Sequence, residues 1–179
     1  TWIILGGLVF GALASLAAFM EPLEDIPFEI NSTLLSTGEI SDSASPVLRR
    51  LRKQARTLRA AILEKLSNIM DGLKKQSMVM EDLVTVRNER YVIPLRHDYG
   101  SHIKGITHDY SRSNKTAYVE PLAVVDENNT LNQIRSDIKE EEIGILRDLT
   151  SLILAHGAAI RENLETYGRL DLIHASACW

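Results

Sequence analysis

SPVLRRLRKQARTLRAAILEKLSNIMDGL, residues 45–73, decides the fold of this 179-residue chain. Its apolar residues recur at steps of three and four, which is the period of one face of an α-helix. Ser45 is a helix-capping hydroxyl, and Pro46 suits the first helical position. The other faces are predominantly basic. The stretch therefore predicts one long, basic, amphipathic helix.

The pattern after this helix changes to that of β-strands. Asn88-Glu89 separates the first two β-rich runs and is a two-residue hairpin signal, although the second turn position lacks glycine. Pro94 predicts an edge position or the end of a strand. A polar loop, residues 110–115, joins the last two runs. The expected strands of this small antiparallel sheet are residues 83–87, 90–95, 103–108 and 116–119.

The helical period returns after Pro121 and lasts to Leu170. It predicts one continuous helix over residues 125–175, about 75 Å long at 1.5 Å per residue. His156 lies on its apolar stripe and is expected in a core or interface. The first half of this helix is acidic, opposite in sign to the helix at 45–73. We therefore expect the two helices to pack antiparallel, with apolar stripes facing and opposite charges along their flanks.

The amino-terminal residues 1–20 carry no charge. Their length permits a membrane span, but three glycines and the absence of a basic flank favour a buried helix. Residues 21–44 read as a connection with one short helix around 28–35. The chain starts without methionine and stops inside an apolar stretch, so we expect a piece of a larger protein. The expected parts are 1–44 (helical core and connection), 45–78 (first long helix), 79–121 (β-rich part) and 122–179 (returning helix).

The expected fold class is mainly α with a small inserted antiparallel β subdomain, in which two long antiparallel helices carry the sheet. The net charge of −4 excludes a chain that is basic throughout. The single cysteine excludes a disulfide framework and fits a reducing compartment, so we expect a cytoplasmic protein.

No catalytic residue or metal site is expected. The sequence lacks the common nucleotide-binding, zinc-protease and paired-cysteine motifs. Three histidines and two aspartates of the β-rich part match no common zinc spacing. Ser111, Ser113, His108 and Asp109 contain the residue types of a hydrolytic triad, but a mobile polar loop would not orient them. The histidines and aspartates are His97, His102, His108, Asp98 and Asp109.

Basic residues of the β-rich part are the better clue to function. They alternate with hydroxyl and amide side chains, a mixture that suits phosphate oxygens. Nearby carboxylates reduce the net positive charge of this part of the chain. The alternative to nucleic-acid binding is therefore an ordinary solvated surface. The candidate nucleic-acid-binding residues are Arg87, Arg90, Arg96, Lys104, Arg112 and Lys115.

Three stretches resemble a known family: SDSASPVLRRLR (41–52), VTVRNERYVIPLR (84–96) and GITHDYSRSNKTAYVEPLAVVDENN (105–129). They closely resemble the bacterial MutS paralogue, the second MutS branch, over nearly all of residues 38–179. The resemblance implies two long lever helices from a helical core, with a β-rich clamp at their far end. It also implies homodimers whose clamps close on duplex nucleic acid through mainly backbone contacts.

The resemblance further implies domains beyond this stretch. An ATPase domain using ATP and Mg²⁺ would follow the levers, and many members add a nuclease domain. This stretch itself would be non-enzymatic and bind double-stranded or branched DNA, in recombination suppression or repair. Two alternatives are a ribosome- or RNA-binding rescue factor with the same fold, and a membrane-anchored helical interaction protein. We expect no membrane partner.

The sequence departs from the family pattern in two turns. Glu89 replaces the glycine of an Asn-Gly turn, which removes the residue best suited to positive φ. In the second turn Asn114 can still adopt a left-handed conformation. Arg112 and Lys115 make this loop more basic than is usual in the family. That change is expected to raise non-specific phosphate affinity without adding base readout.

Overall fold

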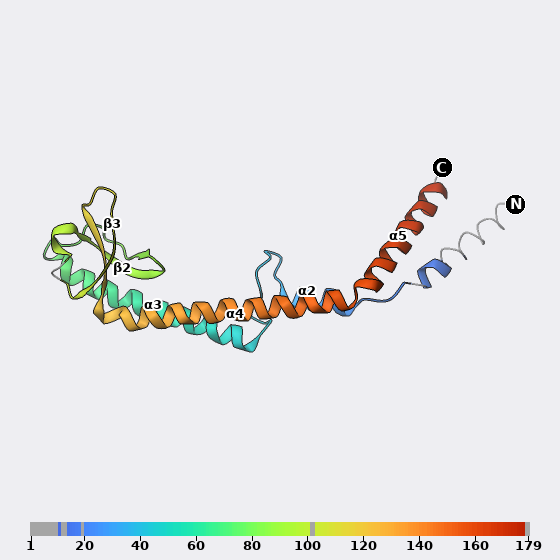
Figure 1. Ribbon diagram of the computed structural model, residues 1–179, viewed down its shortest axis with the longest axis horizontal. Helices are drawn as coiled ribbons and strands as arrows, with labels where there is room; N and C mark the ends of the chain where they lie inside the picture. The colour runs from blue at the N-terminus through green and yellow to red at the C-terminus, as the bar shows by residue number, and fades with distance from the viewer. Residues whose placement is uncertain (1–10, 12–13, 19, 101–102, 178–179) are drawn as a thin grey trace. The chain divides into compact units, whose positions relative to one another are not determined.

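The computed structural model describes residues 11, 14–18, 20–100 and 103–177. The chain divides into two compact units, Ser45–Ile143 and the combination of Thr1–Ala44 with Gly144–Trp179. The unit of residues 45–143 contains the sheet and all six candidate nucleic-acid-binding residues, so it is the unit that positions the site. The fold is mainly α with one small antiparallel sheet, as the sequence predicts (Figure 1).

Helix α3, Pro46–Lys74, is the long basic helix predicted from the sequence. The side-chain oxygen of Ser45 accepts hydrogen bonds from the backbone N–H groups of Val47 (3.1 Å) and Leu48 (3.3 Å). Two of the amides that a helix start leaves without partners are thereby satisfied. The Ser45 hydroxyl also donates to Glu141 Oε1 at 2.6 Å. The capping prediction is confirmed, and the same hydroxyl joins α3 to the returning helix.

Helix α4, Val125–Ala155, runs antiparallel to α3 within the unit of residues 45–143. Arg52 near the start of α3 pairs with Glu142 at 2.7 Å, whereas Lys65 further along pairs with Glu127 at the start of α4. The hydrogen bond from Lys65 lowers the pKa of Glu127 below its usual value. The predicted pairing of opposite charges between the two helices is therefore confirmed at these positions.

The sheet contains four strands in the order β1-β2-β4-β3, and every neighbouring pair is antiparallel. Both predicted hairpins, β1–β2 and β3–β4, are present. The predicted third strand begins two residues too early and ends two residues too early. The strands are β1 (Thr85–Arg87), β2 (Arg90–Arg96), β3 (Gly105–Tyr110) and β4 (Thr116–Pro121).

Two backbone features of the sheet bear on the sequence predictions. Asn88 (φ 49°) and Glu89 (φ 65°) both lie in the left-handed region, as the central residues of a tight hairpin turn require. Pro94 lies within a central strand that continues to Arg96, so it is neither at the predicted edge nor at the predicted end of a strand. Its carbonyl accepts from the Met80 amide at 3.0 Å, so its ring nitrogen faces the same side, away from β4. The ladder between β2 and β4 therefore loses no donor.

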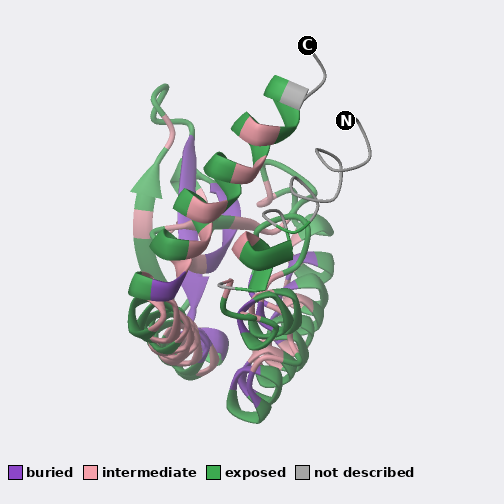
Figure 2. Cartoon of the chain, turned by 90° about the vertical axis from the view of Figure 1, so that its right-hand side faces the viewer, coloured by how far each residue is buried: buried purple, intermediate pink, exposed green. Residues whose placement is uncertain are grey.

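The core of this unit lies between α3, the start of α4 and one face of the sheet. Helix α3 contributes Ile62, Leu66 and Met70, all at most 2% exposed. Alternate residues of β2 and β4 pack against them, because successive side chains of a strand point to opposite faces. These are Tyr91, Ile93, Leu95, Ala117 and Val119. Every residue of β4 is buried (purple in Figure 2), whereas β3 is a largely exposed edge strand.

The returning helix is interrupted, and the prediction of one continuous helix over 125–175 is wrong. Helix α4 ends at Ala155 and helix α5 occupies Gly157–Ala177, with a bend of 57° between them. His156 Nδ1–H donates to the Leu152 carbonyl at 3.0 Å, in competition with the backbone ladder. Gly157 follows directly and has poor helix propensity. The combination of a competing side chain and a glycine accounts for the break.

The apolar stripe beyond the break is only partly covered. His156 is half-buried, but Leu164 and Tyr167 are 69% and 63% exposed. Glu21 and Asn163 connect the segment before α2 to α5: the Glu21 amide donates to Asn163 Oδ1, and Asn163 Nδ2 donates to the Glu21 carbonyl. Helix α2, Asp25–Thr33, matches the short helix expected around 28–35.

Most of the uncharged segment 1–20 lies outside the described residues, so its predicted burial or membrane insertion remains a prediction. Among the described helices, none alone has the length and hydropathy for a membrane span. The bent pair formed by residues 122–155 and 157–176 meets those criteria only when the two are taken together.

Replacing Ser45 with alanine is expected to lower the free energy of unfolding of the unit by about 1–2 kcal/mol, the usual cost of losing an N-cap. The change removes two cap hydrogen bonds and the link to Glu141. Ser67→Ala, at an exposed position within the same helix, is the control and should be neutral or slightly stabilising. Urea unfolding followed by circular dichroism compares them, and equal midpoints would contradict the capping role.

Candidate nucleic-acid interface

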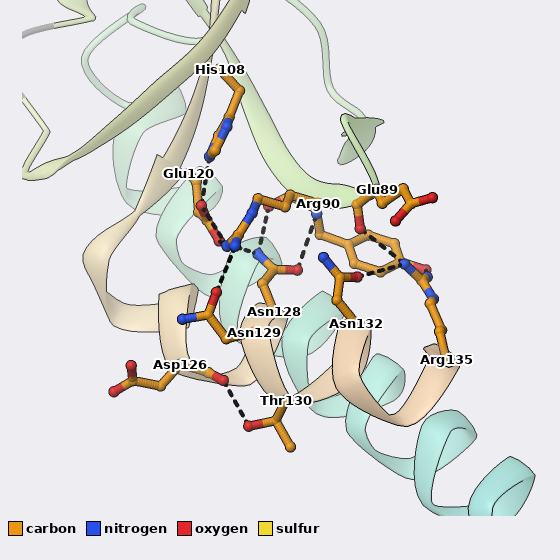
Figure 3. A network of polar contacts seen from close by, with 11 residues as sticks. Glu89, Arg90, His108, Glu120, Asp126, Asn128, Asn129, Thr130, Asn132 and Arg135 are labelled. Carbon is orange, nitrogen blue, oxygen red and sulfur yellow. Dashed lines mark hydrogen bonds and ion pairs between the residues drawn. The ribbon is translucent and has the colours of Figure 1, made fainter. Parts of the chain in front are cut away.

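A buried carboxylate organises the place where the sheet joins α4 (Figure 3). Glu120, on β4, is fully buried. It accepts hydrogen bonds from Arg90 Nη1 (2.9 and 3.2 Å), from Asn128 Nδ2 (2.7 Å) and from His108 Nε2 (2.6 Å). A buried carboxylate is costly unless it is fully hydrogen-bonded, and this one has partners on both oxygens.

Two further side chains tie the β1–β2 hairpin to α4. Asn128 is fully buried, and its amide forms a closed pair with Tyr91: the Tyr91 N–H donates to Oδ1, and Nδ2 donates to the Tyr91 carbonyl, both at 3.1 Å. Arg135 Nη1 donates to the Glu89 carbonyl (2.9 Å) and to Asn132 Oδ1 (3.2 Å). Hydrogen bonds between α4 side chains and the backbone of the hairpin therefore fix the hairpin to the helix.

Two of the six candidate basic residues interact with other side chains of this chain. Arg90 is 23% exposed and is bound to Glu120 and to Asn129 Oδ1. Arg87 lies over the Tyr118 ring, 4.0 Å from its centre, and its Nε is 3.5 Å from Asp109 Oδ2. Both guanidinium groups stabilise the sheet. Their proposed contact with nucleic acid stays a prediction, and their geometry favours a structural role.

Arg96 and Lys115 come together at the other end of β2. The His97 amide donates to the Lys115 carbonyl at 2.9 Å, which joins the end of β2 to the β3–β4 loop. Both side chains line an open depression of about 450 Å³, together with Asn114 and Asp98. The Arg96 guanidinium lies 5.4 Å from the centre of the Tyr99 ring. Two cations and an amide donor thus face solvent around one hollow.

The β3–β4 loop, residues 111–115, is a tight turn and not the loose segment that the sequence suggested. The Ser111 hydroxyl accepts from the amides of Lys115 (3.2 Å) and Thr116 (3.0 Å), and the Asn114 amide donates to the Ser111 carbonyl at 2.8 Å. Asn114 has φ 53°, so the expected left-handed conformation is confirmed. The turn presents Arg112 and Lys115 as exposed side chains.

Lys104 lies on a second depression, of about 640 Å³, which Gly105, Thr107 and Tyr110 of β3 also line. His97 and Tyr110 line the same hollow, with ring centres 5.3 Å apart. Lys104 is exposed, and its carbonyl accepts from the Leu122 amide at 2.9 Å. His97 lines both depressions, but Lys104 precedes Gly105, which pairs with Pro121, so Lys104 lies at the opposite end of β3 from Arg112 and Lys115.

The residue types of a triad do not form one here. His108 Nε2 bonds to Glu120, and the Ser111 hydroxyl accepts a hydrogen bond from the Lys115 amide within the β3–β4 turn. In the part of the chain that the structure describes, no group of three or more His, Cys, Asp or Glu side chains could hold a metal ion. His102, one of the histidines considered from the sequence, lies outside that part.

The network around Glu120 and Asn128 was not predicted from the sequence. From the sequence, His108 and Asp109 were considered as residue types of a triad or a metal site, and Glu120 was assigned no role in a site. The signal that could have found it was a carboxylate inside an otherwise apolar strand, TAYVEP, followed eight residues later by Asn128. Such a carboxylate needs buried donors. Which donors reach it depends on strand order and helix position.

The chain was compared with protein families and with curated proteins. No protein-family model matches the chain. The chain is 39% identical over 168 residues to Endonuclease MutS2 of Geobacillus sp. (strain WCH70), covering 94% of this chain and 21% of that protein. It is 40% identical over 155 residues to Endonuclease MutS2 of Bacillus velezensis, covering 87% and 20% respectively. For Endonuclease MutS2 of Acetivibrio thermocellus the identity is 36% over 165 residues, covering 92% and 21%.

These similarities place the chain among proteins of the MutS class. More narrowly, the chain belongs to the second MutS branch, the MutS2 group, and spans about a fifth of the length of these relatives. The expected family is confirmed.

Proposed function

We propose that residues 45–143 form a lever-and-clamp segment that binds the backbone of double-stranded or branched DNA without sequence specificity. In this proposal α3 and the first half of α4 are the levers, and residues 79–121 are the clamp. The observation that carries it is the exposure of three basic side chains at one end of the sheet, Arg96, Arg112 and Lys115, with the exposed Lys104 at the opposite end of β3.

The chemistry of this end of the sheet suits phosphate. Arg96 and Lys115 line one hollow with the Asn114 amide, and Arg112 projects from the adjoining tight turn. Arginine, lysine and amide donors bind phosphate oxygens but carry no base readout unless they reach base edges. The nearby Asp98 reduces the net charge of the hollow. Modest, salt-sensitive affinity is expected from so few cations.

The rigid base of the clamp supports the same role. Glu120, Asn128 and Arg135 join the hairpin to α4 through buried or fixed side chains, so a movement of the helix pair would carry the sheet with it.

The whole protein would then be a homodimeric ATPase in recombination suppression or DNA repair, and an endonuclease, as its relatives are named. ATP and Mg²⁺ would act in another domain, and their binding would open and close the clamps.

Arg112→Ala combined with Lys115→Ala is expected to weaken duplex binding by the full-length protein and to flatten its salt dependence. Removing one cation that binds a phosphate should reduce the slope of log K against log salt by about 0.9, so the double variant should reduce it by up to about 2. Fluorescence anisotropy with labelled duplex DNA at several salt concentrations measures the slope.

The matched control is Lys53→Ala combined with Lys139→Ala, which removes the same charge from exposed helix positions outside the sheet. An unchanged slope in the loop variant would refute contact through the β3–β4 turn. Competition with structured RNA separates the two kinds of nucleic acid. A clear preference for RNA would favour the ribosome-binding alternative over DNA.

A further inference from the structure

A depression of about 270 Å³ lies between α3 and α4, where β2 begins. Four arginines line it: Arg52, Arg56 and Arg59 from α3, and Arg135 from α4. Tyr91 and three aliphatic residues complete the lining, and no carboxylate belongs to it. The proposed clamp end does not include this hollow, because Tyr91 and Arg96 are five residues apart on β2, about 17 Å at 3.3 Å per residue.

The sequence explains why the arginines converge. Positions 52, 56 and 59 are separated by four and three residues, so they lie on one face of a helix. From the sequence, this basic face was expected only to pair with the oppositely charged, acidic first half of the returning helix. In the structure it forms one wall of a hollow, and Arg135 forms part of the opposite wall.

The guanidinium of Arg135 is held in place by neutral acceptors, and none of them is a carboxylate that would neutralise its charge. Its guanidinium donates to the Glu89 carbonyl, to Asn132 Oδ1 and to the Tyr91 hydroxyl (3.5 Å), all of them neutral acceptors. The guanidinium also lies 5.8 Å from the centre of the Tyr91 ring. A cation fixed by neutral partners loses little further conformational entropy when it binds an anion.

The remaining arginines differ in how far they are engaged. Arg52 pairs with Glu142, and Arg56 also interacts with another residue. Arg59 is exposed, and no side chain that the structure describes forms an ion pair with it. Arg59 and Arg135 therefore supply the available positive charge of this hollow, with Arg56 beside them.

We propose that this hollow is a second nucleic-acid contact and takes a phosphodiester group between Arg59 and Arg135. Forked guanidinium groups bind phosphate through paired N–H donors, and two of them from different helices surround one anion. This inference rests on the proposed function, because it assigns a further contact to the same nucleic-acid ligand. This site would bind the nucleic-acid backbone near the start of β2, while the β3–β4 turn binds it at the opposite end of the sheet.

The other side of the same helix pair offers a matched control. Arg50 and Lys53 line a separate groove with Gln54, Thr57, Leu58, Ala61, Thr130 and Ile134. Arg50 is exposed on α3, as Arg59 is, and no described side chain forms an ion pair with it. Arg59→Glu and Arg50→Glu therefore change net charge equally on the same helix, and neither removes a buried contact.

The test uses the full-length protein with labelled duplex DNA and, in a second arm, structured RNA. Arg59→Glu is expected to weaken binding about tenfold at low salt and to lower the salt slope by about 1, whereas Arg50→Glu stays close to the unmodified protein. Phenylglyoxal modification, read by peptide mass spectrometry, should show Arg59 protected by the nucleic acid and Arg50 equally reactive with and without it. The arm that protects Arg59 identifies the source of the phosphodiester.

The outcomes separate this inference from the proposed function. If the nucleic acid protects Arg112 but leaves Arg59 reactive, or if the Arg59 and Arg50 variants bind alike, the second contact is refuted and the clamp contact stands. If neither nucleic acid binds the full-length protein, the proposed function fails and the second contact fails with it.

Discussion

Glu120→Ala is expected to destabilise the unit of residues 45–143 by about 3–5 kcal/mol, the cost of removing one partner from a buried ion pair. The fully buried carboxylate bonds to Arg90, His108 and Asn128. Without it, the guanidinium of Arg90 and the buried amide of Asn128 would each lose an acceptor. The connection between the sheet and α4 depends on both residues, so the loss should extend to the strands.

Native-state amide hydrogen exchange measures this effect locally, since it reports the free energy of opening for individual strands. The amides of β2 and β4 should lose protection in Glu120→Ala. Glu127→Ala is the matched control, because Glu127 pairs with Lys65 at the surface and an exposed pair contributes only about 0–1 kcal/mol. Equal protection in the two variants would show that the buried network does not stabilise the sheet.

Gly105→Ala is expected to lower the free energy of unfolding by about 3 kcal/mol, because the added methyl group has no room. A Cβ at this position would lie 2.5 Å from the Glu120 carbonyl oxygen and 2.8 Å from Val119 Cγ1. The first of these atoms belongs to the backbone of β4, so a side-chain rotation cannot relieve the contact. Strand β3 would have to move away from β4, at the upper end of the usual cost of overpacking.

Gly72→Ala is the matched control for this substitution. Gly72 lies in α3, and a Cβ there would meet nothing within 4 Å. Alanine at that position should stabilise the helix by about 0.5–1 kcal/mol, because it restricts the unfolded chain and has better helix propensity. The two substitutions should therefore shift the urea midpoint in opposite directions. A neutral Gly105→Ala would mean that β3 is free to separate from β4.

The strongest elements could be predicted because their causes are local. Ser45 and Pro46 define the start of α3, and the apolar spacing that follows defines its buried face. Alternating β-rich runs around Asn88-Glu89 define a hairpin for the same reason: the turn and the strand period are short-range properties. The break at His156 was missed because a side chain bonding to its own helix competes with an otherwise continuous apolar period.

The candidate site was only half predictable for a related reason. Counting basic residues in the β-rich part identified Arg96, Lys104, Arg112 and Lys115, which are exposed, but also Arg87 and Arg90, which bind internal partners. Charge alone does not distinguish a guanidinium that faces solvent from one that faces a buried carboxylate. That distinction depends on strand order, which sets the neighbours of each strand.

By itself, the sequence determined α3 with its cap and the two hairpins, since these depend on residues near one another in the chain, and three matching stretches determined the membership of the second MutS branch. Tertiary structure decided which charges are internal, which donors satisfy the buried Glu120 carboxylate, and that Arg59 and Arg135 line one hollow. Those features join residues from α3, β2, β4 and α4. Their energies arise from desolvation and from contacts between elements, which exist only after the strands and helices have packed.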